Sequence, residues 1–284
     1  MALSRTGLTL VVSVAAVAIT SCGGDEPNTP PAADRSATAP ATASGGAGVT
    51  PVIDGKFRVG SPKQELAIRC WGSGEPAVIL DAGSSSSGIE TFGSLSDDII
   101  EPLAESSTVC TYDRAGTGQT VELPNKRRTI DDQAEELNAL LASAEVPKPR
   151  VLVGSSWGGF VAVQTARNHP AGISGLVLLD VPAGNARLSA QEAPEAAWDH
   201  PTNVERVDSF HAERTMARDT RSLGDVQVTV VTADAGQSDK RDQRSWKRLS
   251  SHFSQVVLSG GHDIYNYDAE GVVEQTLKTV DAAE

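Results

Sequence analysis

The sequence predicts an α/β domain whose central sheet is mostly parallel and covered by helices on both faces. From Leu66 onward, short β-rich apolar segments alternate with amphipathic stretches, the pattern of a sheet built from repeated strand–helix units. A chain of 284 residues is long enough for one large domain of this kind. Its 39% hydrophobic and 21% charged residues exclude a polytopic membrane protein, a collagen-like chain and a wholly disordered one.

The net charge argues against nucleic acid as a partner. Lys and Arg total 24 against 37 Asp and Glu, which gives a formal net charge of −13. Neutralising a phosphate backbone requires an extended basic surface. We therefore expect no nucleic-acid binding.

The first 21 residues have the layout of an export signal. Arg5 precedes a 12-residue apolar run, 8–19, which is shorter than the roughly 20 residues that a membrane-spanning helix needs. Residues 19–22 (ITSC) resemble a bacterial lipobox, although Ile19 and Ser21 are not its commonest residues. The resemblance implies a lipoprotein signal peptide over 1–21 and lipidation of Cys22, with ordinary signal cleavage as the alternative.

Residues 22–50 are predicted to form a disordered tether. They are rich in Pro, Ala, Ser, Thr and Gly and contain almost no large apolar side chain, so they cannot form a core. A random coil of this length reaches on the order of 30 Å. The resemblance to bacterial lipoproteins implies that acyl chains on Cys22 attach the exported domain, 51–284, to the membrane on its extracytoplasmic side.

The predicted strands are short segments of aliphatic and β-branched residues, namely 66–71, 77–83, 108–113, 150–155, 175–180, 226–234 and 255–259. Residues 131–144 carry leucines at helical spacing after acidic residues, which predicts a surface helix. Residues 183–223 interrupt the alternation with Pro, Trp, His and many charges. We interpret them as a small helical lid insertion, since long structureless loops are uncommon in compact domains; a solvated connection is the alternative.

Residues 154–158 (GSSWG) fit the nucleophile pattern G-x-S-x-G, and their context supports it. A predicted strand ends at the pattern and a plausible helix follows it, which places Ser156 on a tight turn between them. Glycine at 154 and 158 leaves room for that turn. The free N–H groups at the start of the helix then face whatever the serine attacks.

At this point the sequence resembles the α/β-hydrolase family over roughly residues 65–280. Residues 81–84 (DAGS) occupy the place where this family forms half of its oxyanion hole, with Ala82 where the family usually has His. The hole uses backbone N–H groups, so the change need not abolish it. The resemblance implies that the amides of Ser84 and Trp157 are the donors. It also implies a structural turn over residues 112–118, in which Asp113 stabilises the turn.

A serine nucleophile needs a base, and the base needs an acid to orient it. His262 follows the last predicted strand and precedes a final helix, where the family places its catalytic histidine. The family order Ser, Asp, His requires a carboxylate after a strand and before His262. Asp234 fits best and Asp180 is the runner-up, because some members take the acid from the preceding strand. The remaining candidates are Asp239 and Asp242.

Cys70 and Cys110 are the cysteines that remain besides Cys22. An exported domain meets an oxidising compartment, which favours a disulfide. The family's strand order makes its second and fourth strands neighbours, and these cysteines lie on the segments assigned to them. The resemblance therefore implies a Cys70–Cys110 bridge, with free buried thiols as the alternative.

These features predict an extracytoplasmic serine hydrolase that cleaves carboxylic esters through an acyl-enzyme at Ser156, with a small-molecule acyl substrate as its partner. Nothing in the sequence resembles a zinc signature, a P-loop or a dinucleotide fingerprint, so we expect neither a metal nor a cofactor. The serine argues against the related dehalogenases and epoxide hydrolases, which use a carboxylate nucleophile. An aminopeptidase or amidase of the same fold remains an alternative, as does a catalytically silent binding module.

Overall fold

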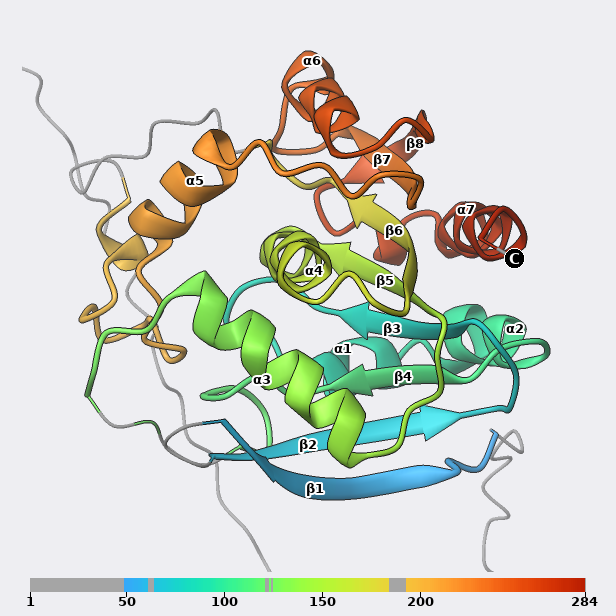
Figure 1. The fold of residues 1–284 in the computed structure, drawn as a ribbon, viewed down its shortest axis with the longest axis horizontal. Coiled ribbons are helices and arrows are strands. Elements are labelled where there is room, and N and C mark those ends of the chain that lie inside the picture. The colour runs from blue at the N-terminus through green and yellow to red at the C-terminus, as the bar shows by residue number, and fades with distance from the viewer. Residues whose placement is uncertain (1–48, 61–63, 121–122, 124, 184–192, 284) are drawn as a thin grey trace, which may run out of the picture. The chain divides into compact units, whose positions relative to one another are not determined.

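The computed structural model describes residues 49–60, 64–120, 123, 125–183 and 193–283. The predicted signal peptide, Cys22 and nearly all of the predicted tether lie outside these residues. Within them, one sheet has the strand order β1-β2-β4-β3-β5-β6-β7-β8 (Figure 1). Its strands are β1 (Ile53–Val59), β2 (Gln64–Trp71), β3 (Ala77–Asp81), β4 (Val109–Tyr112), β5 (Arg150–Ser155), β6 (Ile173–Leu179), β7 (Gln227–Ala235) and β8 (Phe253–Gly261).

The sheet is mostly parallel, as the sequence predicts. Only the pairs β1–β2 and β2–β4 are antiparallel, and the pairs from β4 through β3 to β8 are parallel. The seven predicted strands are all present, with ends within two residues of the prediction. β1 was not predicted. It is an edge strand in which residues alternate between partly buried and exposed, so its apolar signal is weak.

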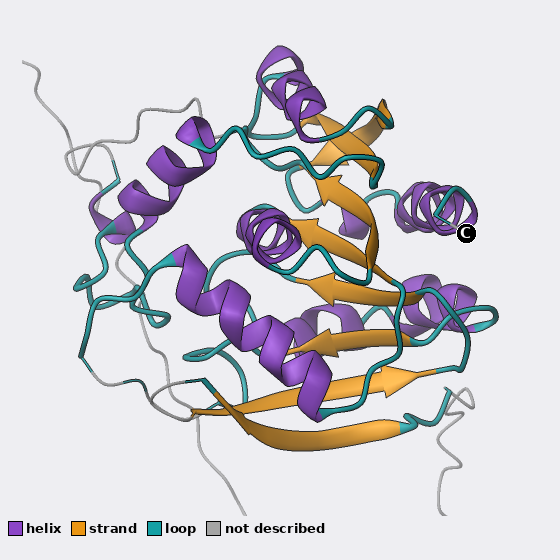
Figure 2. Ribbon diagram, viewed as in Figure 1, coloured by secondary structure: helices purple, strands orange, loops and turns teal. Residues whose placement is uncertain are grey.

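Helices cover both faces of the sheet, which confirms the predicted layers (Figure 2). The apolar side chains of α3 and α4 pack on one face, and those of α1, α2 and α7 pack on the other. The α-helices of the described residues are α1 (Gly88–Gly93), α2 (Glu101–Ala104), α3 (Ile130–Ser143), α4 (Trp157–Asn168), α5 (Ser209–Arg218), α6 (Lys240–Gln243) and α7 (Ala269–Asp281). The helical turns are η1 (Ser96–Ile100), η2 (Pro194–Ala196), η3 (Arg244–Leu249) and η4 (Ile264–Asn266).

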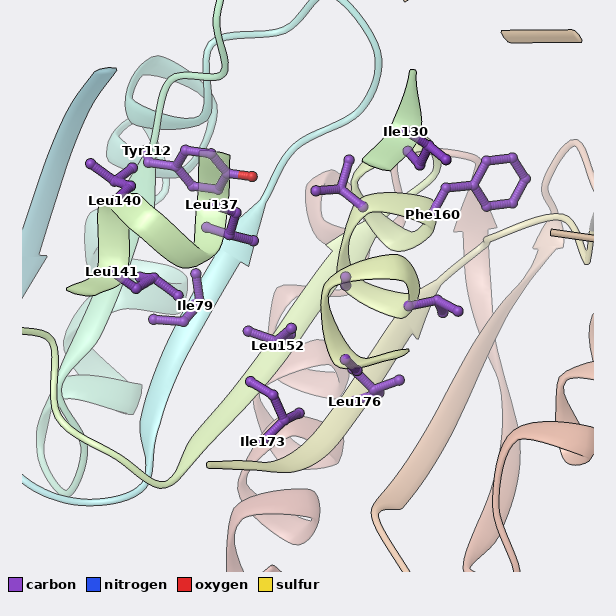
Figure 3. Packing of buried hydrophobic residues seen from close by; sticks show 14 of the residues in the cluster. Ile79, Tyr112, Ile130, Leu137, Leu140, Leu141, Leu152, Phe160, Ile173 and Leu176 are labelled. Carbon is purple, nitrogen blue, oxygen red and sulfur yellow. The ribbon is translucent and has the colours of Figure 1, made fainter. Parts of the chain in front are cut away.

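α3 shows how the sequence produces this packing. Thr129 caps its N-terminus in a reciprocal pair with Asp132, which satisfies backbone N–H groups at the start of the helix. Leu137, Leu140 and Leu141 then lie on one side of α3 and are almost completely buried against the sheet (Figure 3). This face fixes α3 beside α4, which carries the residues that follow the nucleophile pattern.

The described part of the insertion 183–223 contains η2 and the ten-residue helix α5, and residues 184–192 lie outside the described residues. The side chain of Asp208 caps α5 by accepting a hydrogen bond from the amide of His211 at 2.8 Å. Across the residues that the structure describes, no helix is both long and apolar enough to cross a membrane.

Candidate active site

Ser156 lies on a strained turn between the end of β5 and the start of α4. Its backbone has φ 50° and ψ −115°, a conformation that a residue with a side chain rarely adopts. Two backbone hydrogen bonds hold it there: the Ser156 amide donates to the Leu179 carbonyl at 3.0 Å, and the Gly159 amide donates to the Ser156 carbonyl at 3.0 Å. The turn is the strand-to-helix elbow that the sequence pattern predicts.

The glycines of this pattern are explained by close backbone contacts. A Cβ atom on Gly154 would lie 2.5 Å from the backbone of Gly158. On Gly158 it would lie 2.4 Å from the Asp81 carbonyl oxygen at the end of β3, and on Gly159 it would lie 2.2 Å from a methyl group of Val181. The elbow therefore packs directly against the neighbouring strand ends, and only glycine fits at these positions.

The structure pairs His262 with Asp180. The Nδ1 atom of His262 lies 2.6 Å from Oδ2 of Asp180. His262 follows β8 and Asp180 follows β6, so both lie at the carboxyl ends of parallel strands, as Ser156 does. Asp180 is also adjacent to Leu179, whose carbonyl accepts the hydrogen bond from the Ser156 amide.

The assignment of Asp234 as the partner of His262 is therefore wrong in this structure. Asp234 is the penultimate residue of β7, and its exposed carboxylate accepts hydrogen bonds from the Ser259 hydroxyl and the Gly260 amide, both at 2.8 Å. These two bonds tie β7 to the end of β8. Of the other candidates, Asp239 caps α6, and Asp242 accepts a hydrogen bond from the Ala183 amide at 2.8 Å.

The hydrogen bonds around Asp180 keep its carboxylate ionised. Its side chain is fully buried, and it accepts hydrogen bonds from the Gln243 amide group at 2.6 Å and from the Gln237 backbone amide at 3.0 Å, besides its contact with His262. Burial raises the pKa of Asp180, but these hydrogen bonds outweigh burial and bring the pKa below its usual value. A carboxylate in this position holds the imidazole in one orientation and stabilises its cation.

A cavity of about 360 Å³ opens beside Ser156. Ser84 and Trp157, whose amides are the predicted oxyanion donors, both line it. The Ser84 loop lies close to Ser156, because a Cβ on Gly83 would be 3.9 Å from the Cβ of Ser156. The insertion forms much of the remaining wall, with lining residues Ala193, Glu195, Ala196, Thr202, Asn203, Glu205, Val207, Ser209 and Glu213.

Within the described residues, the Ser156 hydroxyl makes no hydrogen bond to the ring of His262. Catalytic hydrogen bonds are often long in the absence of substrate and shorten when substrate binds. The arrangement therefore places Ser156, Ser84 and Trp157 around one cavity, and it places a histidine with an ionised carboxylate partner at the same edge of the sheet.

A buried polar cluster beneath the Ser84 loop was not identified from the sequence. Its members are Asp81, Tyr112, Arg114, Gln133 and Glu205. Burial raises the pKa of Asp81 to about 6, against the opposing effect of the Arg114 charge. The pKa of Glu205 lies below its usual value, because the contacts with Arg114 outweigh the opposing effect of burial. Arg114 lies in the turn 112–118, which the sequence predicts to be structural. This turn was the sequence feature that could have pointed to the buried cluster.

Asp113 has the structural role expected of it. One carboxylate oxygen accepts hydrogen bonds from the Ser87 hydroxyl at 2.6 Å and the Ile89 amide at 3.2 Å, and the other accepts one from the Gln119 amide at 2.9 Å. The fully buried side chain thus ties the turn 112–118 to the start of α1.

Cys70 and Cys110 form a disulfide in the structure. They lie directly opposite each other on the antiparallel neighbours β2 and β4, which is the strand order that the family resemblance implies. Over the described ranges, no group of three or more His, Cys, Asp or Glu residues is placed to hold a metal ion.

Comparison with known proteins agrees with this architecture. The family model described as "alpha/beta hydrolase fold" matches residues 82–223. "Uncharacterized protein YqjL" of Bacillus subtilis is 28% identical over 195 residues, 67% of this chain and 74% of that protein. "Putative carbamate hydrolase RutD" of Caulobacter segnis is 31% identical over 228 residues, 65% of this chain and 85% of that protein.

The solved structure of a thermophilic esterase from Thermogutta terrifontis has a TM-score of 0.66 and 19% identity, over 82% of this chain and 99% of that one. At this identity the likeness concerns the fold alone. The family model spans half of the chain, and the strand order and the nucleophile elbow agree with it. The chain therefore belongs to the α/β-hydrolase family.

Proposed function

We propose that this chain is a serine hydrolase in which Ser156 is the nucleophile, His262 the general base and acid, and Asp180 the residue that orients His262. The observation that carries the proposal is the contact between His262 Nδ1 and the ionised Asp180, at strand ends next to the strained Ser156 turn. This arrangement leaves the other ring nitrogen of His262, Nε2, to exchange a proton with the serine.

The proposed reaction has two halves. His262 takes the proton of the Ser156 hydroxyl as its oxygen attacks the carbonyl carbon, and the carbonyl oxygen becomes an oxyanion held by the amides of Ser84 and Trp157. The tetrahedral adduct collapses, the leaving alcohol receives the proton from His262, and an acyl-enzyme remains. Water then attacks the acyl carbon with His262 as base, and the acid and free Ser156 are released.

Carboxylic esters with small acyl groups are the proposed substrates. The cavity of about 360 Å³ is modest, and its lining mixes aromatic residues such as Trp157 and Phe160 with many polar side chains. A long aliphatic acyl chain would leave those polar groups without water. The relative named as a carbamate hydrolase adds carbamates to the substrates that we would screen.

An aminopeptidase or amidase is the second candidate, favoured by the charge of the cavity. Glu195 and Glu213 line it beside Glu205, whose charge is paired with that of Arg114, and the described lining residues include no Lys or Arg. Such a wall suits a substrate with an ammonium group. Turnover of aminoacyl amides in preference to short-chain esters would select this candidate.

The test is fluorophosphonate labelling of the purified full-length chain, with mass spectrometry to locate the adduct. We expect the adduct on Ser156 and its loss in both Ser156→Ala and His262→Ala. A folded wild-type protein that takes no label and hydrolyses no ester, carbamate or aminoacyl amide would instead support a catalytically silent binding module.

We also propose that the chain is exported and lipid-anchored through Cys22, facing the extracytoplasmic side. The lipobox-like residues 19–22 support this, and so does a disulfide-forming cysteine pair, which suits an oxidising compartment. Expression in bacteria fed an alkyne analogue of palmitate should label the wild-type chain in the membrane fraction. Cys22→Ala should abolish the label, and its persistence would refute the anchor.

A further inference from the structure

Arg114 binds the backbone of the loop that carries the predicted oxyanion donor. Its Nη1 atom donates to the Ala82 carbonyl at 2.7 Å, and its Nη2 atom donates to the Gly83 carbonyl at 2.5 Å. The guanidinium is nearly completely buried, with 3% of the side chain exposed. Ser84, the next residue of the loop, lines the cavity beside Ser156.

Glu205, which comes from the insertion 183–223, completes this support. Its Oε1 atom accepts hydrogen bonds from the Ser85 amide at 2.7 Å and from Nη2 of Arg114 at 2.9 Å. Its Oε2 atom accepts from Nε of Arg114 at 2.8 Å and from Nε2 of Gln133 at 2.5 Å. The carboxylate therefore contacts the loop directly and also orients the guanidinium that holds it.

These contacts fix both peptide groups that flank Ser84. A peptide group is planar and trans, so its carbonyl and its N–H point in opposite directions. Because the Gly83 carbonyl points at Arg114, the Ser84 N–H points away from the buried guanidinium. The next peptide group is held at the Ser85 amide by Glu205. Ser85 has φ 58°, a strained value that needs such external support.

The same carboxylate is linked to the residue that carries the second donor. The indole Nε1 of Trp157 donates to Oε1 of Gln133 at 2.9 Å, and the amide nitrogen of Gln133 donates to Glu205. One connected group of side chains thus contacts the Ser84 loop and the indole of Trp157, whose backbone N–H is the second predicted donor. Networks of this kind rigidify their surroundings when every member is satisfied.

We propose that Arg114 and Glu205 are positioning residues that aim the Ser84 N–H into the oxyanion site, so that Glu205, a residue far along the chain from Ser84, is needed for the site to be complete. This inference rests on the proposed serine-hydrolase function. Neither residue touches the reacting atoms in the proposed mechanism. Their effect is on the tetrahedral intermediates of both acylation and deacylation, because each places an oxyanion against the same amide.

The test compares Glu205→Gln with wild-type protein on an ester substrate. Gln lacks the charge and the second acceptor atom that hold Arg114. Loss of one oxyanion donor lowers kcat by about 100- to 1000-fold, so a misaimed donor should lower kcat by at least about ten-fold, with KM within about three-fold. The affinity for a boronic acid, whose tetrahedral adduct places an oxygen in the same site, should fall in parallel with kcat/KM.

Arg114→Lys is the second variant, because it keeps a positive charge beside the carboxylates of Asp81 and Glu205. A single ammonium group cannot reach Ala82, Gly83 and Glu205 in the fork geometry of a guanidinium. We expect the same selective loss of kcat in a folded protein, verified by circular dichroism.

Arg150→Lys is the matched control for Arg114→Lys. Arg150 is also a buried arginine whose guanidinium donates to backbone carbonyls, those of Pro147, Leu141 and Val146, and it begins β5, at the opposite end of that strand from Ser156. The substitution removes the same fork of hydrogen bonds to the backbone, so it should destabilise the fold while kcat stays within about two-fold.

The outcomes separate this inference from the proposed function. Turnover by the wild-type protein with unchanged kcat in folded Glu205→Gln or Arg114→Lys would overturn the inference and leave the function intact. An equal loss of kcat in Arg150→Lys would also overturn it, by showing a general effect of destabilisation. An inert wild-type protein would overturn the proposed function first.

Discussion

At the scale of single residues, the site depends on what surrounds each carboxylate. Asp180 and Asp234 both follow or end a strand, yet one is fully buried against His262 and the other is exposed beside Ser259. The buried carboxylate accepts several hydrogen bonds, which keep its pKa below the usual value despite burial. A carboxylate that is both buried and ionised can stabilise the imidazolium of His262 away from bulk water.

Asp180→Asn should abolish most activity, whereas Asp234→Asn should not. An Asn amide can donate to Nδ1 of His262 and hold the tautomer that cannot accept the serine proton. We expect kcat to fall on the order of 1000- to 10,000-fold for Asp180→Asn and to stay within about two-fold for Asp234→Asn. Steady-state ester hydrolysis at neutral pH measures both, and the reverse pattern would restore Asp234 as the acid.

At the scale of elements, the close packing of α4 against the strand ends positions Ser156. Gly158 lets the first turn of α4 approach the backbone of β3, so the elbow and the Ser84 loop are neighbours. The neighbouring atoms are the carbonyl oxygens of Asp81 and Ala82, which cannot move without disturbing β3. The geometry of the site is thus a packing property of two elements.

Gly158→Ala should therefore lower both stability and activity. Overpacking of this kind destabilises by about 1 to 3 kcal/mol, or roughly 2 to 12 °C in melting temperature. Gly93→Ala in α1 is the control, because its added Cβ would meet no atom within 4 Å. Calorimetry should show a melting temperature for Gly93→Ala equal to or above that of the wild type. Equal behaviour of the two variants would contradict the packing argument.

At the scale of the whole domain, distant segments meet at buried charges. Glu205 from the insertion contacts Arg114 from the turn after β4, across 91 positions of sequence. The disulfide between Cys70 and Cys110 joins β2 to β4, the strand that directly precedes that turn. The contact between Glu205 and Arg114 therefore bears on both the stability of the domain and the geometry of the site, whereas the disulfide bears on stability.

The Glu205 contact should make stability depend on acid pH. Its pKa is below the usual 4.5 in the folded state, so the folded protein binds its proton less readily than the unfolded chain does. The stabilisation is complete above about pH 4.5 and is lost as the pH falls through the folded-state pKa. Urea unfolding should show a gap in the free energy of unfolding between wild type and Glu205→Gln at pH 7, above the pKa of about 6 of the neighbouring Asp81, and this gap should narrow below pH 4.5. A gap that widens in acid would contradict this.

Loss of the disulfide should destabilise the domain without removing its chemistry. Breaking a bridge across about 40 residues typically costs 2 to 5 kcal/mol, since the unfolded chain regains its freedom. The double variant Cys70→Ser and Cys110→Ser should unfold at lower urea concentration, while kcat on an ester at 20 °C stays within about three-fold. An unchanged urea midpoint would contradict a structural role for the bridge.

The sequence alone was sufficient for the features encoded by local patterns. The alternation of apolar segments and amphipathic helices identified the layers and seven of the strands, and the strand–GSSWG–helix pattern identified the turn at Ser156. His262 was located by its place after the last strand. These features depend on residues close together in the chain, where periodicity and turn chemistry act directly.

Tertiary structure decided which distant side chains meet. The choice of Asp180 over Asp234 depends on which strand end faces His262, and the contacts of Arg114 with Glu205 depend on where the insertion docks. β1 gained its place by pairing with β2, against a weak apolar signal of its own. A buried charge or an edge strand is stabilised by partners that the fold brings together from distant parts of the chain. Composition and local spacing do not identify those partners.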